Sequence, residues 1–402
     1  MKILIVDDEF HIRKITSTIL KKSGYEVIEA ESGAEAIDKL LNNPEINFII
    51  TDWVMPNING LELCKKIRAI FNERYIYIIL LTAKNEKEEL VQGMEAGSDD
   101  FIVKPFNVEE LRVRVRAGER ILKLEEELIE RNKKIEIAYE QISTDLKYAH
   151  KLQTSLLPNK SNNLSFNKNN FKINNVFFDW LYIPSSFLSG DTFNIFKIDD
   201  EHIAFYHLDV SGHGIPSSVL SASLNRLLLP SQNSFIKKSI ENPPFYKIES
   251  ISKLLENLNN YFLENNEDGN YFTIAYFMVN VKTGKTNYSI AGHTKPIILR
   301  SEGKIEVLED NGYPIGLIED AVYTEHEVYL NSNDKVFLYS DGITECQNSL
   351  EEMFSEHRLL NILSSTQNNN LKSSINTLKN NILNWNGSES FSDDISALAV
   401  SF

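Results

Sequence analysis

The sequence predicts an α/β protein in three consecutive parts: a doubly wound, five-stranded parallel sheet over residues 1–119, a coiled-coil helical linker over 120–158, and packed β-sheets flanked by helices over 159–402. Three observations support this. Apolar runs alternate with amphipathic segments in the first part, apolar residues recur every seven positions in the second, and many short β-rich runs with few helices fill the third. A chain of 402 residues exceeds the usual size of one domain, roughly 100–200 residues, so several domains are expected.

Composition limits the classes of partner and compartment. The formal net charge of −16 argues against a nucleic-acid partner, because such proteins normally present a basic face. Two cysteines, Cys64 and Cys346, cannot form a disulfide framework, which favours a reducing, cytoplasmic compartment. The N-terminus lacks the apolar stretch of a signal peptide, and no run approaches the ~18 apolar residues of a membrane span. We therefore expect a cytoplasmic protein with no membrane segment.

The first part places polar residues where its predicted strands end. The strands read KILIV, YEVIEA, INFIIT, YIIL and DFIVK, and helical patterns separate them, as in a parallel sheet with right-handed crossovers. Ligands of such folds bind at the carboxyl ends of the strands. The polar residues at these ends are Asp7, Asp8, Asp52, Thr82 and Lys104.

This pattern resembles the receiver domain of bacterial response regulators over the whole first part. The resemblance implies that Asp52 accepts a phosphoryl group from a sensor histidine kinase or a phosphotransfer protein. It implies a Mg²⁺ site of three carboxylates and one backbone carbonyl, from Asp7, Asp8, Asp52 and Val54. It implies that Thr82 and Lys104 contact the phosphoryl oxygens, and that Phe101 is the aromatic residue that rotates in the switch.

The chemistry agrees with these roles. A carboxylate attacks an activated phosphorus only when a metal and a cation offset the charge of the transferring group. The Lys104-Pro105 bond is a candidate for the rare cis form. One alternative stays open at this point: the domain could bind Mg²⁺ and never be phosphorylated physiologically.

The second part predicts a two-stranded coiled coil and hence a homodimer. No glycine or proline occurs between Arg120 and Leu156. A heptad of apolar positions is formed by Ile121, Leu128, Ile135, Ile142, Ala149 and Leu156. Arg131 and Asp145 interrupt the companion row, so the seam is imperfect. The alternative is a single solvated helix that only connects two domains.

Four carboxylates in the third part suggest a divalent-metal site. Each lies near the end of a predicted strand beside flexible backbone; they are Asp191, Asp209, Asp341 and Asp393. Bringing such groups together without cations would cost roughly a few kcal/mol per pair at contact distance. Oxygen-rich sites suit Mg²⁺ or Mn²⁺.

Six motifs in this part resemble the protein phosphatase 2C superfamily, in its bacterial stress-response and sporulation branch: LSGDTF, LDVSGHGIPSSVLSA, AGHTKP, YPIGL, YSDGITE and SDDISALAV. The resemblance implies an α-β-β-α sandwich, a centre of two Mn²⁺ or Mg²⁺ ions, and hydrolysis of phosphoserine or phosphothreonine on a protein. The expected substrate is an anti-sigma-factor antagonist. The implied catalytic and metal positions are Asp191, Asp209 with the Val210 carbonyl, Asp341 and Asp393.

The third part also departs from this family's pattern. Ser189 stands for the first glycine and Asn194 for the second acid of the usual GGD-x-x-D motif, which could weaken one metal site or be tolerated. Asp394 stands where relatives carry Asn or Asp. Residues 230–250 break the pattern with prolines and form either a flap near the site or an inert insertion.

The third part contains two motif histidines, and two other functions are alternatives to the phosphatase. His213 could be a general acid, but a lone motif histidine is more often structural, and the same holds for His293. The alternative function is a non-catalytic pseudo-phosphatase that binds or sequesters a regulatory partner under receiver control. A nucleotide cyclase would also use carboxylates and metals, but nothing resembles its signature loop.

Overall fold

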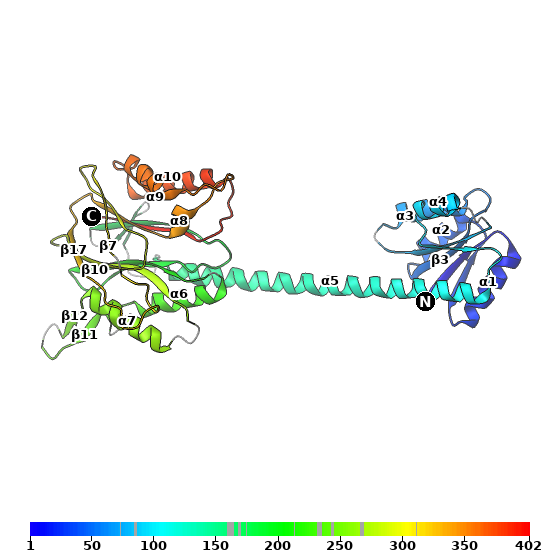
Figure 1. Ribbon diagram of the computed structural model, residues 1–402, viewed down its shortest axis with the longest axis horizontal. Coiled ribbons are helices and arrows are strands. Elements are labelled where there is room, and N and C mark those ends of the chain that lie inside the picture. Colours follow the sequence, from blue (N-terminus) through cyan, green and yellow to red (C-terminus); the bar gives the residue numbers. More distant parts are fainter. Residues whose placement is uncertain are drawn as a thin grey trace. The chain divides into compact units, whose positions relative to one another are not determined.

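The computed structural model (Figure 1) divides into two compact units, Met1–Gln141 and Ile142–Phe402. The described residues are 1–72, 74–83, 87–158, 165–167, 170–173, 175–212, 214–230, 235–242, 245–265, 269–310 and 312–402.

The first unit is built on a five-stranded parallel sheet of order β2-β1-β3-β4-β5. Its strands are β1 (Lys2–Val6), β2 (Glu26–Ala30), β3 (Ile46–Asp52), β4 (Tyr77–Thr82) and β5 (Asp100–Val103). Its helices are α1 (Phe10–Lys22), α2 (Gly33–Asn42), α3 (Gly60–Ile70), α4 (Lys87–Glu95) and the first part of α5 (Val108–Leu156). The strand order reverses beside β1, which confirms the doubly wound sheet that the sequence predicts.

Apolar clusters cover both faces of this sheet. One cluster packs α2 and α3 against the sheet and includes Leu40, Leu63 and Ile67, while the other includes Leu111 and Val115 of α5. The start of α3 is fixed by the side chain of its N-cap Asn59, which accepts a hydrogen bond of 2.9 Å from the backbone of Glu62. A Cβ atom at Gly60 would lie 2.3 Å from the carbonyl oxygen of Asp52, so only glycine lets α3 begin directly against the end of β3.

Helix α5 is continuous over 49 residues and contains the predicted linker helix. Its core contacts in the first unit extend to Leu122. Beyond that point apolar side chains stand exposed, among them Leu128 at 52% and Ile142 at 58%. Charged residues interrupt the apolar positions throughout, and no helix in the described part of the chain is long and apolar enough to cross a membrane.

The second unit contains two antiparallel sheets, of order β17-β14-β13-β10-β9 and β16-β15-β18-β19-β8-β7-β6. The first sheet consists of β9 (Thr192–Lys197), β10 (His202–Val210), β13 (Phe272–Asn280), β14 (Lys285–Ala291) and β17 (His326–Tyr329). The second consists of β6 (Ser165–Asn167), β7 (Asn170–Ile173), β8 (Val176–Ile183), β15 (Ile297–Leu299), β16 (Ile305–Val307), β18 (Lys335–Tyr339) and β19 (Ile395–Ser401).

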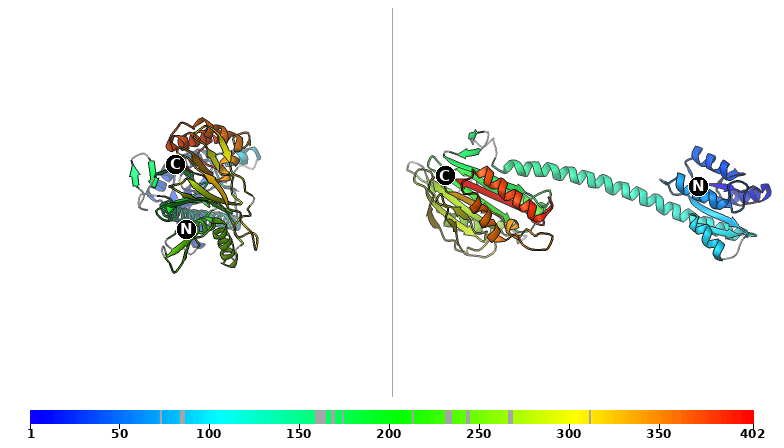
Figure 2. Two further views of the ribbon diagram at one scale, coloured as in Figure 1. Left: turned by 90° about the vertical axis from the view of Figure 1, so that its left-hand side faces the viewer. Right: turned by 90° about the horizontal axis from the view of Figure 1, so that it is seen from above.

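Three apolar clusters define four layers in this unit, seen in Figure 1 and from two further sides in Figure 2. The helices are α6 (Ile215–Leu227), α7 (Ile251–Asn265), α8 (Asp341–Glu345), α9 (Ser355–Ser365) and α10 (Leu371–Asn386). One cluster packs α6 and α7 on the first sheet, a second lies between the sheets, and a third packs α9 and α10 on the second sheet. The α-β-β-α arrangement implied by the resemblance is therefore confirmed.

Two expectations for this part need correction. The helical patterns over residues 217–229, 251–263 and 373–383 predict three helices here, but the described residues contain five. The short α8 and α9, which buries only Leu359 and Leu363 well, leave weak periodic patterns. Residues 159–175 are rich in Asn and Lys and show no periodicity, which predicts a polar linker or loop, but their described residues include β6 and β7. These strands continue the sheet beyond β8. Their backbone pairing, β7 with β8 and β6 with β7, defines them as strands, and not an apolar pattern of their own.

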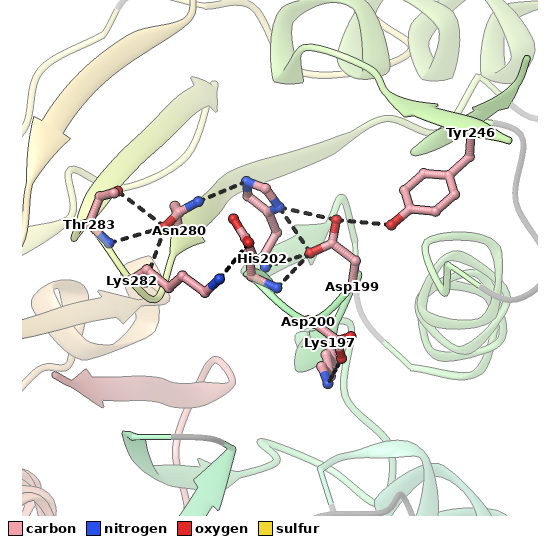
Figure 3. Close-up of polar contacts among 9 residues, drawn as sticks. Lys197, Asp199, Asp200, His202, Tyr246, Asn280, Lys282 and Thr283 are labelled. Carbon is pink, nitrogen blue, oxygen red and sulfur yellow. Dashed lines mark hydrogen bonds and ion pairs between the residues drawn. The ribbon is translucent and has the colours of Figure 1, made fainter. Parts of the chain in front are cut away.

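The segment 230–250 holds a small two-stranded sheet of β11 (Lys237–Ser239) and β12 (Tyr246–Ile248). The hydroxyl of Tyr246 donates to a carboxylate oxygen of Asp199 at 3.2 Å, and the same carboxylate accepts hydrogen bonds from the backbone and ring of His202 (Figure 3). This insertion is therefore tied to the turn between β9 and β10.

Candidate functional site

The first unit gathers three carboxylates at the carboxyl edge of its sheet. Asp7 follows β1 and Asp52 ends β3, and one oxygen from each of Asp7, Asp8 and Asp52 lies within 4.8 Å of the others. Asp7 and Asp52 are buried, whereas Asp8 is exposed. Three oxygen ligands with one open side are typical of a Mg²⁺ site.

Lys104 supplies the positive charge beside these acids. Its ammonium lies 2.8 Å from Asp52 Oδ1 and 3.1 Å from Asp7 Oδ2. Burial raises the pKa of Asp52, and the hydrogen bond and charge of Lys104 oppose that rise. The backbone N–H of Lys104 donates to the carbonyl of Thr82 at 2.6 Å, which brings the end of β4 to the same edge. The Lys104-Pro105 bond is cis, as the sequence indicated.

The remaining predicted receiver residues lie along the same strands. Thr82 is fully buried at the end of β4, and Phe101 in β5 packs half-buried against the core. Val54 follows the buried Trp53 in the loop after β3 and is 65% exposed. The structure thus brings Asp7, Asp8, Asp52 and Lys104 together. Thr82 ends the neighbouring strand β4, and Val54 lies in the loop that follows β3.

In the second unit, the four predicted acids come from both sheets of the sandwich. Asp191 precedes β9 and is 1% exposed, and Asp209 lies in β10 directly before Val210. Asp341 begins α8 after β18, and the exposed Asp393 precedes β19. The strands that carry them are neighbours within each sheet, β10 beside β9 and β18 beside β19.

Mutual charge shows that these acids are neighbours. Burial, followed by the charge of Asp341, raises the pKa of Asp209 to about 7, and Asp393 adds to the rise. Burial and the charge of Asp209 hold the pKa of Asp191 well above its ordinary value. Burial and then Asp393 likewise raise the pKa of Asp341.

The donor set fits divalent cations. Within the described part of the chain, no lysine or arginine forms an ion pair with these four acids, in contrast to Lys104 in the first unit. They are also more widely spaced than the first trio, since among the described residues only that trio brings three oxygens within 4.8 Å of one another. Oxygen ligands that repel one another and lack a basic partner suit Mg²⁺ or Mn²⁺.

Asp394 has a different task from its neighbour Asp393. One of its oxygens accepts hydrogen bonds from the backbone and hydroxyl of Ser185, at 2.7 and 2.9 Å, and the other accepts from the N–H of Gly190 at 2.8 Å. Asp394 therefore holds the loop that leads into Asp191.

Two glycines allow the close approach of the segments that carry the acids. A Cβ atom at Gly342 would lie 2.2 Å from the carbonyl oxygen of Asp394, and one at Gly190 would lie 3.0 Å from that of Val210. Any side chain at Gly342 would push α8 away from the start of β19. The SGD and SDG motifs thus bring Asp191 toward Val210 and Asp341 toward Asp393.

The two departures from the family pattern have local partners. The Asn194 amide donates to Asn225 Oδ1 at 2.8 Å, and the Asn225 amide donates to Thr192 Oγ1 at 2.9 Å, so buried side chains of β9 and α6 are paired. The hydroxyl of Ser189 accepts a hydrogen bond of 3.0 Å from the N–H of Asp191. Both residues support the loop and strand around Asp191 through neutral hydrogen bonds.

Three contributors to this site escaped the sequence reasoning: Gln153, His207 and Ser396. The Ser396 hydroxyl donates to Asp191 Oδ2 at 2.5 Å, His207 Nε2 lies 2.7 Å from that hydroxyl, and Gln153 bonds the backbone of Ser189. Gln153 belongs to no recognisable short pattern; Ser396 lies in the SDDISALAV motif and His207 directly precedes LDVSGHGIPSSVLSA, but neither motif assigns these two residues a role. The candidate acid His213 lies outside the residues that the structure describes.

Comparison with known proteins supports a two-part assignment. Residues 3–116 match the response regulator receiver domain family, and residues 199–402 match the family of Stage II sporulation protein E (SpoIIE). Chemotaxis protein CheY1 of Helicobacter pylori is 44% identical over 113 residues, which are 28% of this chain and 91% of CheY1. Transcriptional regulatory protein ResD of Bacillus subtilis is 46% identical over 116 residues, which are 29% of this chain and 47% of ResD.

A solved structure extends the match to the second unit. The SiaA-PP2C domain of Pseudomonas aeruginosa superposes with a TM-score of 0.54 at 16% identity, covering 66% of this chain and 98% of that domain. At this identity the likeness establishes the fold. The PP2C family is metal-dependent, in agreement with the oxygen-rich acids of the sandwich. The chain therefore belongs to the SpoIIE family of PP2C-type serine/threonine phosphatases, and it carries a response regulator receiver domain before the phosphatase domain.

Proposed function

We propose that this chain is a two-component response regulator whose output is Mn²⁺- or Mg²⁺-dependent hydrolysis of phosphoserine or phosphothreonine on a protein, controlled by phosphorylation of Asp52. The observation that carries the enzymatic half is the mutual charge of Asp191, Asp209, Asp341 and Asp393, which no described basic residue offsets. Such an arrangement is costly unless cations bind.

In this proposal the second unit would hold two divalent cations. The ligands are Asp191, Asp209, the carbonyl of Val210, Asp341 and Asp393. When bound, two divalent cations neutralise the phosphate and make water more acidic, so that it can attack in line. Neither cysteine of the chain acts as a nucleophile; both are buried.

The chain's own residues arrange these ligands. Asp394 fixes the loop before Asp191 through Ser185 and Gly190, and Ser396 orients the Asp191 carboxylate. Because these hydrogen bonds come from the protein itself, they orient part of the site for metal and substrate.

For the receiver domain, we propose that Asp52 takes a phosphoryl group from a sensor histidine kinase or a phosphotransfer protein. Lys104 already lies 2.8 Å from Asp52, so it can offset charge on the incoming group. Mg²⁺ would bind Asp7, Asp8, Asp52 and the carbonyl of Val54. Thr82 and Phe101 would respond to the new phosphoryl oxygens.

We further propose that the chain is a homodimer through α5 and that its substrate is a phosphorylated anti-sigma-factor antagonist. Exposed apolar side chains at heptad positions support the dimer; examples are Leu128, Ile135 and Ile142, which are 52–66% exposed. The substrate class rests on the resemblance to the sporulation branch of the phosphatases. The competing function is a pseudo-phosphatase that only binds its partner.

The test compares hydrolysis of a phosphoserine peptide by the full chain and by Asp209→Asn and Asp341→Asn, with Mn²⁺ present. Each acid supplies ligand charge that no described neighbour replaces, so each substitution is expected to lower the rate by about 100-fold or more while the unfolding transition is retained. Asp200→Asn is the matched control, because this acid is exposed on the β9–β10 turn and pairs only with Lys197 among the described residues.

The outcomes separate the two functions. Near wild-type hydrolysis by Asp209→Asn contradicts the metal assignment. Tight binding of the phosphoprotein by the wild-type chain without turnover, in either metal, favours the pseudo-phosphatase.

A further inference from the structure

A line of hydrogen-bonded side chains crosses the sandwich and ends on Asp191. Thr273 Oγ1 lies 2.7 Å from His293 Nδ1, and His293 Nε2 lies 2.9 Å from His207 Nδ1. His207 Nε2 lies 2.7 Å from Ser396 Oγ, whose proton goes to Asp191 Oδ2 at 2.5 Å. The line starts on β13, passes through β10 of the same sheet, and reaches β19 of the opposite sheet.

The inner part of this line is shielded from solvent. His207 is 0% exposed, and Ser396 and Asp191 are each 1% exposed. The ring of Phe193 stacks on His207 with centroids 5.9 Å apart. Burial lowers the pKa of His207 well below its ordinary value and also lowers the pKa of His293, which is only partly buried, so both rings favour the neutral form. In so dry a setting a hydrogen-bond partner is difficult to replace with water.

When Asp191 is ionised, the donors and acceptors of these five side chains allow the hydrogen bonds of the line to run in one direction only. An ionised carboxylate only accepts, so the single hydroxyl proton of Ser396 must point to Asp191. The Ser396 oxygen then accepts from His207, which must carry its proton on Nε2. The bare Nδ1 of neutral His207 accepts from the Nε2–H of His293, and the bare Nδ1 of His293 accepts from the hydroxyl of Thr273.

We propose that Thr273, His293 and His207 are positioning residues that fix the Ser396 hydroxyl as a donor to Asp191. Through Ser396, the three residues hold the Asp191 carboxylate in one orientation. This inference rests on the proposed function, because it gives Asp191 a place in the metal centre. Thr273 is well placed for the task, since it is the cross-strand partner of Asp209 in the β10–β13 ladder.

Removing the Thr273 hydroxyl should allow every hydrogen bond of the line to reverse its direction. Without the Thr273 hydroxyl, His293 can place its proton on Nδ1 and leave Nε2 bare. His207 can then protonate Nδ1 and accept on Nε2, which draws the Ser396 proton away from Asp191. The effect reaches Asp191 although Thr273 has no described contact with it.

The first experiment reads the protons directly in the full chain saturated with Mg²⁺, because a carboxylate that binds a cation is ionised. Nitrogen-15-labelled histidine and two-bond proton–nitrogen NMR distinguish Nε2–H from Nδ1–H rings, and His293→Gln and His207→Gln assign the signals. We expect both histidines as neutral Nε2–H tautomers. An Nδ1–H tautomer or a charged ring at either position in the wild-type chain overturns the proposal, and this measurement requires no variant to keep its activity.

The second experiment compares Thr273→Val, which keeps the shape but removes the hydroxyl, with Thr273→Ser, which keeps the hydroxyl. Calorimetric titration with Mn²⁺ should show an affinity lowered by about 10–100-fold at the phosphatase domain of Thr273→Val and unchanged in Thr273→Ser. The receiver site, which neither substitution touches, is the internal reference. Equal affinity in the two variants overturns the proposal.

A second pair of variants, at His293, tests the same line in case Thr273→Val does not fold. His293→Gln retains one amide donor and one acceptor, whereas His293→Leu retains neither, so only the leucine variant should lose affinity. Failure here is distinguishable from failure of the proposed function. If Asp209→Asn abolishes hydrolysis but both pairs bind Mn²⁺ alike, the phosphatase assignment stands and the positioning line does not; if Asp209→Asn retains hydrolysis, the phosphatase assignment itself is wrong.

Discussion

Gln153, near the end of α5, clamps the backbone of Ser189 with both ends of its side-chain amide. Its Nε2 donates to the Ser189 carbonyl at 2.6 Å, and the Ser189 N–H donates to its Oε1 at 3.2 Å. Gln153 is only 7% exposed. Ser189 in turn accepts a hydrogen bond from the N–H of Asp191, so one side chain connects the end of α5 to the loop that carries an acid of the candidate centre.

This clamp predicts a strong effect of Gln153→Leu on hydrolysis. The substitution leaves the buried N–H of Ser189 without its partner, at a cost of about 1–3 kcal/mol. The Ser189 carbonyl keeps only the longer hydrogen bond of 3.4 Å from the Ser221 hydroxyl. We expect kcat/KM to fall by roughly 10–100-fold at saturating Mn²⁺. The matched control is Gln141→Leu, because Gln141 is exposed on the same helix. An unchanged rate in Gln153→Leu would show that Asp394 alone holds the loop.

The pKa of Asp209 predicts a pH-dependent response to Mn²⁺. Burial and Asp341 raise this pKa to about 7, above an ordinary value of 3.8. In the metal-free chain, the contribution of Asp209 to the free energy of unfolding is therefore most favourable at low pH. This contribution is lost as the pH rises from about 4 through 7. Mn²⁺ needs the ionised carboxylate, so below pH 7 binding must also release a proton.

We accordingly expect Mn²⁺ to raise the unfolding temperature of the phosphatase domain more at pH 8 than at pH 6. Its apparent affinity should fall by about tenfold per pH unit below 7 for each proton released. Thermal unfolding with and without Mn²⁺ at three pH values measures both. Asp209→Asn removes the titrating group and should flatten the dependence; an equally steep dependence in this variant would assign it to another group.

The receiver geometry predicts a single site of phosphorylation. In the presence of Mg²⁺ and acetyl phosphate, the wild-type chain should gain one phosphoryl group and Asp52→Ala none, because Asp52 ends β3 beside two acidic neighbours, with Lys104 at 2.8 Å. Intact-protein mass spectrometry counts the groups. Asp38→Ala, which removes an exposed acid of α2, should behave as the wild type. Stoichiometric labelling of Asp52→Ala would show that another residue is the acceptor.

Local sequence patterns predicted the receiver sheet, the strands of the sandwich other than β6 and β7, and the acids at strand ends, since buried strands require apolar runs and ligand-binding groups gather where strands stop. They could not reveal Gln153, His207 or Ser396. The hydrogen bonds of these residues join positions 36, 189 and 205 apart in the chain. Only the closed sandwich brings such pairs together, and no spacing in the sequence marks them. The same reason hid the neutral pairing of Asn194 with Asn225.

The final prediction concerns α5 as the link between phosphorylation and hydrolysis. We expect phosphorylation of Asp52 to raise phosphatase activity by changing how two copies of α5 pack. Coupling requires an element with two arrangements that both sites can bias. Helix α5 runs unbroken from Val108 to Leu156, and its seam is interrupted at Arg131 and Asp145, which leaves it able to pair and to shift. A shift of ~1–2 Å near its end would act on the Gln153 clamp.

The measurement is hydrolysis of a phosphoprotein with and without beryllofluoride, a mimic of the Asp52 phosphoryl group. In Leu128→Asp with Ile142→Asp, two exposed seam positions gain charges that repel across a dimer, so we expect a monomer by light scattering and no response to beryllofluoride. The control is Lys133→Asp with Lys147→Asp, which has the same 14-residue spacing on the opposite face of the heptad and an even larger change of charge. The control should remain a dimer and respond as the wild type does. An equal response in the monomeric variant would remove α5 pairing from the mechanism, and no response in the wild type would remove the coupling between the domains.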